Sequence, residues 1–101
     1  MKSKEINDLG TALEQVGKKF DLLIIKAISK KQGRAGFNQI LNSLEALNPR
    51  TLSTRLKDLE KNKIITKNLI IGTPVKTEYA LTTKGKKLLP IIKEIESWAK
   101  Q

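Results

Sequence analysis

One stretch near the middle of the chain repeats its hydrophobic residues with the period of an α-helix. Its leucines lie four and three positions apart, and therefore on one side of a helix: Leu52, Leu56 and Leu59. Asn48 suits the N-cap position, because its side-chain oxygen can accept hydrogen bonds from the free amides of the first turn. Pro49 suits the first helical position, where its missing N–H loses no hydrogen bond. The pattern predicts a helix over about residues 49–62 with its leucines facing inward.

The face opposite the leucines is basic and rich in hydroxyl groups. It has two cations, three hydroxyls and no carboxylate, from Arg50, Thr51, Ser53, Thr54 and Lys57. Side chains of these types reach phosphates and base edges in a DNA major groove. A basic outer face is also typical of a solvated surface helix, so this stretch alone leaves both interpretations open.

The helical period returns in four other stretches, which predict helices over residues 3–16, 20–29, 37–47 and 84–100. The second of these helices is apolar almost all round, as expected for the centre of a small domain. The polar stretch 30–36 holds two glycines and predicts a loop. Pro90 should kink the last helix or split off its first turn.

After the middle helix the period changes to that of β-strands. Residues 64–71 and 75–81 are rich in β-branched side chains, and the turn signal Gly72-Thr73-Pro74 lies between them. A β-hairpin therefore follows two short helices joined by a tight turn, which is the order of elements in a winged helix-turn-helix. The predicted fold is mainly α with a small β-hairpin (α+β), in a single domain over residues 1–101.

The first and last predicted helices have more apolar surface than one small core needs. Their surplus residues are Ile6, Leu9, Leu13, Val16, Ile91, Ile95 and Trp98. Two apolar terminal helices on a small domain favour a homodimer with a two-fold interface. The alternative is that both helices only close the core of a monomer.

The charge of the chain is strongly positive and unevenly distributed. Twenty Lys and Arg residues against ten Asp and Glu residues give a formal net charge of +10. Residues 50–87 hold ten basic and three acidic residues, which suggests a surface for nucleic acid or anionic lipid. The longest fully apolar run, 22–25, is far too short for a membrane span, and residues 1–5 show no signal peptide. We expect a soluble cytoplasmic protein that is associated with the nucleoid and not with a membrane.

The residues that most enzymes and metal sites need are missing. The chain has no cysteine and no histidine, which excludes disulfides, thiolate zinc sites and the commonest general base. Glu94 and Glu96 lie two positions apart on a predicted helix and so do not face each other. Gly17-Lys18 and Gly85-Lys86 lack the rest of a phosphate-binding loop. We therefore expect no catalytic site, metal or cofactor.

Four stretches carry a resemblance to a known family: 17–25, 36–40, 51–60 and 74–85, with Leu89-Pro90 and Trp98 further on. They are similar to the Gly-Lys-Trp segment, the Arg-Phe-Asn-Glu-Leu segment, the recognition helix and the wing of the HxlR-type branch of MarR-like winged helix-turn-helix regulators. The chain lacks the Cys that often precedes the family's Gly-Lys-Trp segment, and Phe20 replaces Trp, so thiol-based sensing is not carried over. Gly36 stands where the family usually has Arg, and Arg34 lies two residues earlier.

The resemblance implies a homodimeric transcription regulator that occupies a pseudo-palindromic operator in double-stranded DNA. The helix over about 49–62 would enter the major groove, and its base-edge candidates are Arg50, Ser53, Thr54 and Lys57. The phosphate candidates are Thr51, Arg55, Asn38 and Arg34. For Arg55 an equal alternative is a stem packed on the core with a solvated head. The wing, about 64–81, would follow the backbone or the adjacent minor groove through Lys67, Thr73 and Lys76.

Two other functions remain open from the sequence. A protein that coats DNA without choosing sequence fits the charge of +10, although coating needs only cations and not a face rich in hydroxyls. A winged helix can also serve as a protein-interaction module, with Ile70-Ile71 of the wing as the docking surface. The sequence does not indicate a small-molecule effector.

Overall fold

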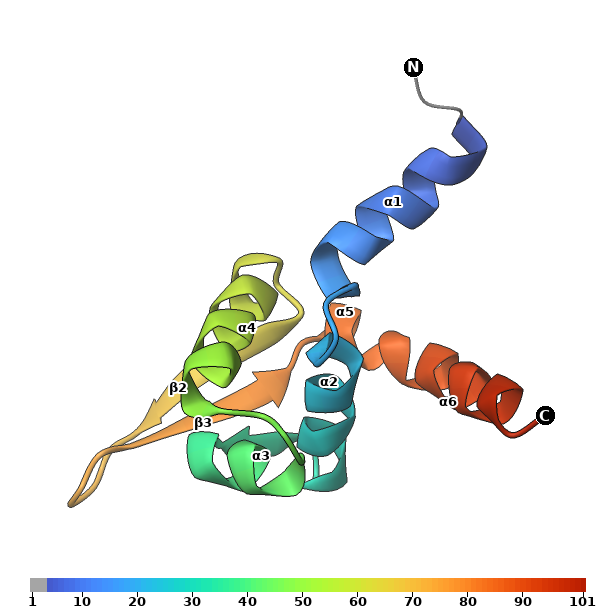
Figure 1. Cartoon of the computed structure of the whole chain (residues 1–101). Coiled ribbons are helices and arrows are strands. Elements are labelled where there is room, and N and C mark those ends of the chain that lie inside the picture. The colour runs from blue at the N-terminus through green and yellow to red at the C-terminus, as the bar shows by residue number, and fades with distance from the viewer. Residues whose placement is uncertain (1–3) are drawn as a thin grey trace.

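The computed structural model describes residues 4–101 and has six helices and three strands in this part of the chain (Figure 1). Their bounds, in chain order, are α1 Lys4–Val16, α2 Asp21–Lys30, β1 Arg34–Gly36, α3 Phe37–Ser43, α4 Pro49–Lys61, β2 Ile65–Ile70, β3 Lys76–Leu81, α5 Thr83–Lys86 and α6 Leu88–Ala99. Ser3, the predicted start of the first helix, lies outside the described residues. The predicted order of helices followed by a hairpin and a last helix is confirmed.

The hairpin is joined by a third strand that the sequence pattern did not predict. β2 and β3 pair antiparallel from Ile65↔Leu81 to Ile70↔Lys76, and β1 pairs with the other edge of β3, which gives the order β1-β3-β2. The prediction of a loop over 30–36 is therefore wrong for its last three residues. A strand of three residues is too short to show an alternating pattern, and only Ala35 points into the core.

Helix α3 ends at Ser43, four residues before its predicted end. Leu44 has extended backbone angles, φ −125° and ψ 124°. The leucines that continued the helical period still pack on the core from this irregular segment: Leu44 is partly buried and Leu47 is 9% exposed. Their burial explains why an apolar spacing alone misplaced the end of the helix.

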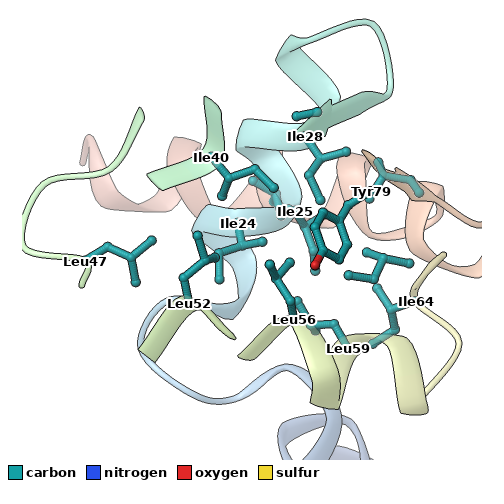
Figure 2. Close-up of a cluster of buried hydrophobic side chains, with 14 residues drawn as sticks. Ile24, Ile25, Ile28, Ile40, Leu47, Leu52, Leu56, Leu59, Ile64 and Tyr79 are labelled. Atoms are coloured by element: carbon teal, nitrogen blue, oxygen red, sulfur yellow. The ribbon is translucent and has the colours of Figure 1, made fainter. Parts of the chain in front are cut away.

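One hydrophobic core holds α2, α4 and the sheet together (Figure 2). Ile24, Ile25 and Ile28 of α2 are fully buried, which confirms α2 as the central helix. The core also contains residues of α3, α4, the sheet and α6: Ile40, Leu52, Leu56, Leu59, Ile65, Tyr79, Leu81 and Ile92. Helix α2 is not buried on all sides, although it is apolar almost all round, since Leu23 on its outer side is 45% exposed.

The terminal helices extend from the core on the side away from the wing (Figure 1). The last predicted helix is split into α5 and α6 at Lys87, as the proline led us to expect. Pro90 is the third residue of α6, where a helix has no intrahelical partner for the backbone N–H. Val16, at the end of α1, packs against the core, whereas most of α1 stands clear of it.

Candidate nucleic-acid interface

Helix α4 is oriented by a capped start and by its leucine side. Asn48 has an extended backbone, and its Oδ1 accepts from the Thr51 N–H at 2.8 Å, as the sequence predicts for an N-cap. Leu52 and Leu59 are fully buried and Leu56 is 2% exposed. Figure 2 shows these leucines pointing into the core, and the residues on the opposite side of α4 are exposed or partly exposed.

We call that side the outer face of α4, and its residues are Arg50, Thr51, Ser53, Thr54 and Lys57. Arg50, Thr54 and Lys57 are exposed, and Thr51 and Ser53 are partly exposed. Within the described residues neither Arg50 nor Lys57 forms an ion pair. The Thr54 hydroxyl donates to the Arg50 carbonyl at 3.1 Å, so its oxygen still has accepting capacity. The outer face thus presents two unneutralised cations beside hydroxyl groups.

Arg55 differs from the expectation that it holds a phosphate. Its side chain is only 10% exposed and lies against Asp21 at the start of α2. Nε donates to Asp21 Oδ1 at 2.7 Å and Nη2 donates to Asp21 Oδ2 at 3.2 Å, while Nη1 donates to Asp58 Oδ2 at 2.6 Å. The hydrogen bonds to Asp21 raise the pKa of Arg55 above its ordinary value, despite partial burial. Arg55 therefore joins α4 to α2 and does not face outward.

Asp21 is the residue that holds Arg55 in place, and the sequence analysis did not single it out. It is completely buried, and besides Arg55 it accepts a hydrogen bond from the Lys18 N–H at 3.0 Å. Its partner lies 34 positions away in the sequence, so no local pattern could reveal the pair. The available signal was a single acid at the edge of an apolar helix, which a buried cation would have to neutralise.

The wing, which we define as β2, β3 and the turn between them, carries its cations on both faces. Lys67 lies opposite Tyr79 in the register and so shares the face that leads into the core and toward α4. Lys76 lies opposite Ile70 and is on the other face. Both lysines and Thr73 in the turn are exposed. Helix α4 and the wing lie on the same side of the molecule (Figure 1).

The remaining phosphate candidates are placed differently from each other. Asn38 and Lys76 line one hollow of about 620 Å³ between the start of α3 and the wing. Arg34 lies opposite Ala80 on the sheet face that points away from α4. The structure therefore places Asn38 and a wing lysine along the same hollow, and it does not bring Arg34 to the outer face of α4.

The expected dimerisation residues are mostly exposed. On α1, Ile6, Leu9 and Leu13 are 59%, 61% and 54% exposed. On α6, Ile91, Ile95 and Trp98 are 52%, 46% and 74% exposed. Val16 differs from the other six, because it is half-buried against the core of its own chain. Exposure of this much apolar surface on two helices is unusual for a monomer.

Comparison with known protein families establishes the family to which the chain belongs. The model of the HxlR-like helix-turn-helix family matches residues 15–101. The chain belongs to the HxlR-like helix-turn-helix family. The match covers the outer face of α4, the wing and α6, so the resemblance drawn from the sequence is confirmed.

Relatives of this HxlR-like chain are similar in sequence and in structure. The HTH-type transcriptional regulator YvaP of Bacillus subtilis is 40% identical over 88 residues, which cover 87% of this chain and 80% of YvaP. YodB of Bacillus subtilis is 34% identical over 91 residues, which cover 90% and 80%. The reduced form of YodB has a TM-score of 0.80 at 32% identity over 100% of this chain and 94% of that chain. The oxidised redox regulator HypR has a TM-score of 0.81 at 26% identity over 92% and 94%.

These similarities confirm the winged helix-turn-helix fold and the class of protein. The chain is an HTH-type transcriptional regulator of the HxlR-like family and not an enzyme. YodB has been solved in reduced, diamide-treated and quinone-bound forms. The present chain contains no cysteine, so chemistry at a thiol is not open to it. None of its described helices is long and apolar enough to cross a membrane.

Proposed function

We propose that this HxlR-like chain is a single winged helix-turn-helix domain that binds pseudo-palindromic double-stranded DNA as a homodimer in the cytoplasm. The observation that carries the proposal is the outer face of α4. Three buried leucines fix this face outward, and it offers two cations without ion-pair partners among the described residues, together with hydroxyls. This is the set of groups that a helix in the major groove needs.

Each outer-face residue has a proposed role. Arg50, Ser53, Thr54 and Lys57 would contact base edges, and Thr51 would contact a phosphate near the capped start of α4. An Arg or Lys bidentate to guanine contributes about 1–3 kcal/mol of discrimination against a wrong base. Arg55 is left out of the contact set, because Asp21 and Asp58 occupy its guanidinium.

The wing would extend the contact beyond the major groove. Lys67 and Thr73 would follow the backbone or the adjacent minor groove, and Lys76 with Asn38 would hold phosphate across the hollow that they share. Arg34 is left out of this arrangement, because it is not among the residues that line this hollow. Such contacts position the protein and carry no sequence information of their own.

The homodimer is supported by the exposed apolar residues of α1 and α6. These helices project from the side of the molecule opposite the wing, so pairing through them would leave both copies of α4 free (Figure 1). A two-fold dimer would present its two recognition helices to half-sites about one helical turn, or a multiple of it, apart.

The test is a selection from random duplexes at low and high salt. One enriched palindrome supports the proposed regulator, flat enrichment indicates a DNA-coating protein, and no duplex bound at low salt indicates a protein-interaction module. If about 6–10 phosphates are neutralised per dimer, affinity should fall by about 10³–10⁵-fold between 50 and 200 mM salt. Arg50→Ala should relax the choice of sequence, and Lys67→Ala should weaken all duplexes alike.

A further inference from the structure

A pocket with an apolar floor and a basic rim lies on the outer side of α2, away from the outer face of α4. Its volume is about 320 Å³, at the small end of the range for ligand pockets. Leu23 and Ala27 of α2 and Leu44 after α3 supply the apolar lining. Leu23 is 45% exposed and Leu44 is partly buried, so the floor is open to solvent and not filled by the protein's own core.

Lysines provide the polar groups that can act on a ligand in this pocket. Lys26, Lys30 and Lys31 line it together with Ser43. The Ser43 hydroxyl already donates to the Gln39 carbonyl at 2.6 Å, so the ammonium groups are the available side-chain donors. Among the described residues, Lys30 and Lys31 form no ion pair.

One carboxylate of the protein shows how an anion is held here. Glu96 of α6 accepts a hydrogen bond from Lys26 Nζ, which joins α6 to α2 beside the pocket. That hydrogen bond, with the charges of Lys100 and Lys30, holds the pKa of Glu96 below its ordinary value. Lys26 is therefore shared with a carboxylate of the protein itself, whereas Lys30 and Lys31 keep their positive charge available to attract the carboxylate of a ligand.

We propose that this pocket binds a small amphipathic carboxylate, with its apolar body on Leu23, Ala27 and Leu44 and its carboxylate between Lys30, Lys31 and Lys26. The head would compete with Glu96 for Lys26, so occupancy of the pocket and the contact between α2 and α6 would share one cation. A ligand with a single negative charge fits better than a polyanion, because the lining away from the rim is apolar. The site is separate from the proposed DNA contacts and goes beyond the proposed function.

Hexanoate is the probe that combines a carboxylate with a short apolar body. Amide chemical shifts of the whole chain should be followed by NMR during titration at constant ionic strength and without DNA. We expect saturable shifts of the amides of Ala27, Lys30 and Leu44, with an affinity in the millimolar range for so few atoms. Acetate and inorganic phosphate test the charged head without the apolar body, and hexan-1-ol tests the apolar body without the charge. Each of the three should shift these amides much less than hexanoate does.

One double variant and one matched pair of single variants distinguish the pocket from general surface charge. Lys30→Gln combined with Lys31→Gln should weaken hexanoate binding by about five-fold or more, because the head loses its two unpaired cations. Glu96→Gln should strengthen binding by about two- to five-fold, because it removes the competitor for Lys26 at an exposed site. Glu94→Gln makes the same charge change two residues away on α6 and should leave the affinity unchanged.

Several results would overturn the proposal. Equal shifts with hexan-1-ol would mean that only apolar surface binds, and equal shifts with acetate or phosphate would mean that only charge binds. Shifts confined to Ile91, Ile95 and Trp98 would place the probe on the proposed dimer face. Equal effects of Glu96→Gln and Glu94→Gln on hexanoate affinity would show that the ligand does not compete with Glu96 for Lys26. Because no DNA is present, none of these results depends on whether the chain binds DNA.

Discussion

The buried ion pair between Asp21 and Arg55 joins α2 to α4, and we predict that breaking it lowers the free energy of unfolding by a large amount. Asp21 is completely buried and the Arg55 side chain is 10% exposed, so removing either charge leaves the other with poor solvation. Breaking one partner of such a pair typically costs about 3–5 kcal/mol. The whole domain should be stable by only about 5–15 kcal/mol, so the loss should be easy to measure.

The two single substitutions should differ in size. Arg55→Met leaves the Asp21 carboxylate buried with only the Lys18 N–H as a partner, so we expect the upper end of that range. Asp21→Asn leaves Arg55 bonded to Asp58, whose side chain is 49% exposed, and we expect a smaller loss of about 2–3 kcal/mol. The double variant should lose clearly less than the sum of both, because no unpaired buried charge remains.

Urea unfolding followed by far-UV circular dichroism measures these losses, with Asp8→Asn on the exposed side of α1 as the matched control. A loss below about 1 kcal/mol for Asp21→Asn, or strictly additive losses, would refute the reasoning. The salt dependence of DNA binding gives a second check. Folded Arg55→Met should keep the wild-type slope, because Arg55 holds no phosphate, whereas Lys67→Ala should reduce it by about one per subunit.

Three further predictions follow from other parts of the structure. Ile95→Asp should shift sedimentation from dimer to monomer, and an unchanged sedimentation coefficient would contradict the proposed interface. Gly85→Ala should lower the unfolding temperature steeply, since an added Cβ would meet the Ile64 carbonyl oxygen within 3 Å; an unaltered temperature would show that the contact relaxes. Burial, and the charge of Glu60, raise the pKa of Tyr79, so unfolding free energy should fall above about pH 10 in the wild type and less in Tyr79→Phe.

Local signals in the sequence were sufficient for α4 and the hairpin. Asn48 and Pro49 determine where α4 begins, and the leucine spacing determines which side it buries, so its bounds and its outer face could both be predicted. Their richness in β-branched residues, with a turn signal between them, likewise located β2 and β3. Each of these features depends on residues close together in the chain.

Features that depend on distant partners could not be predicted in the same way. β1 exists because Arg34–Gly36 pairs with β3 more than forty positions later, and the short segment has no pattern of its own. Arg55 lies beside the leucine stripe by its spacing in the helix. Only the fold brings the buried carboxylate of Asp21 to it. Leu44 and Leu47 continue the helical spacing, but they lie after the end of α3 and are apolar because they pack on the core.

Protection of guanine N7 from methylation tests most directly whether the outer face of α4 reads the major groove. On a selected duplex, the wild-type protein should protect guanines in two patches whose centres lie about 10–10.5 base pairs, or a multiple of that, apart. Arg50→Ala should lose protection at the same guanine of each half-site while the complex persists at low salt. A bound duplex whose guanines all remain as reactive as in free DNA would contradict the account.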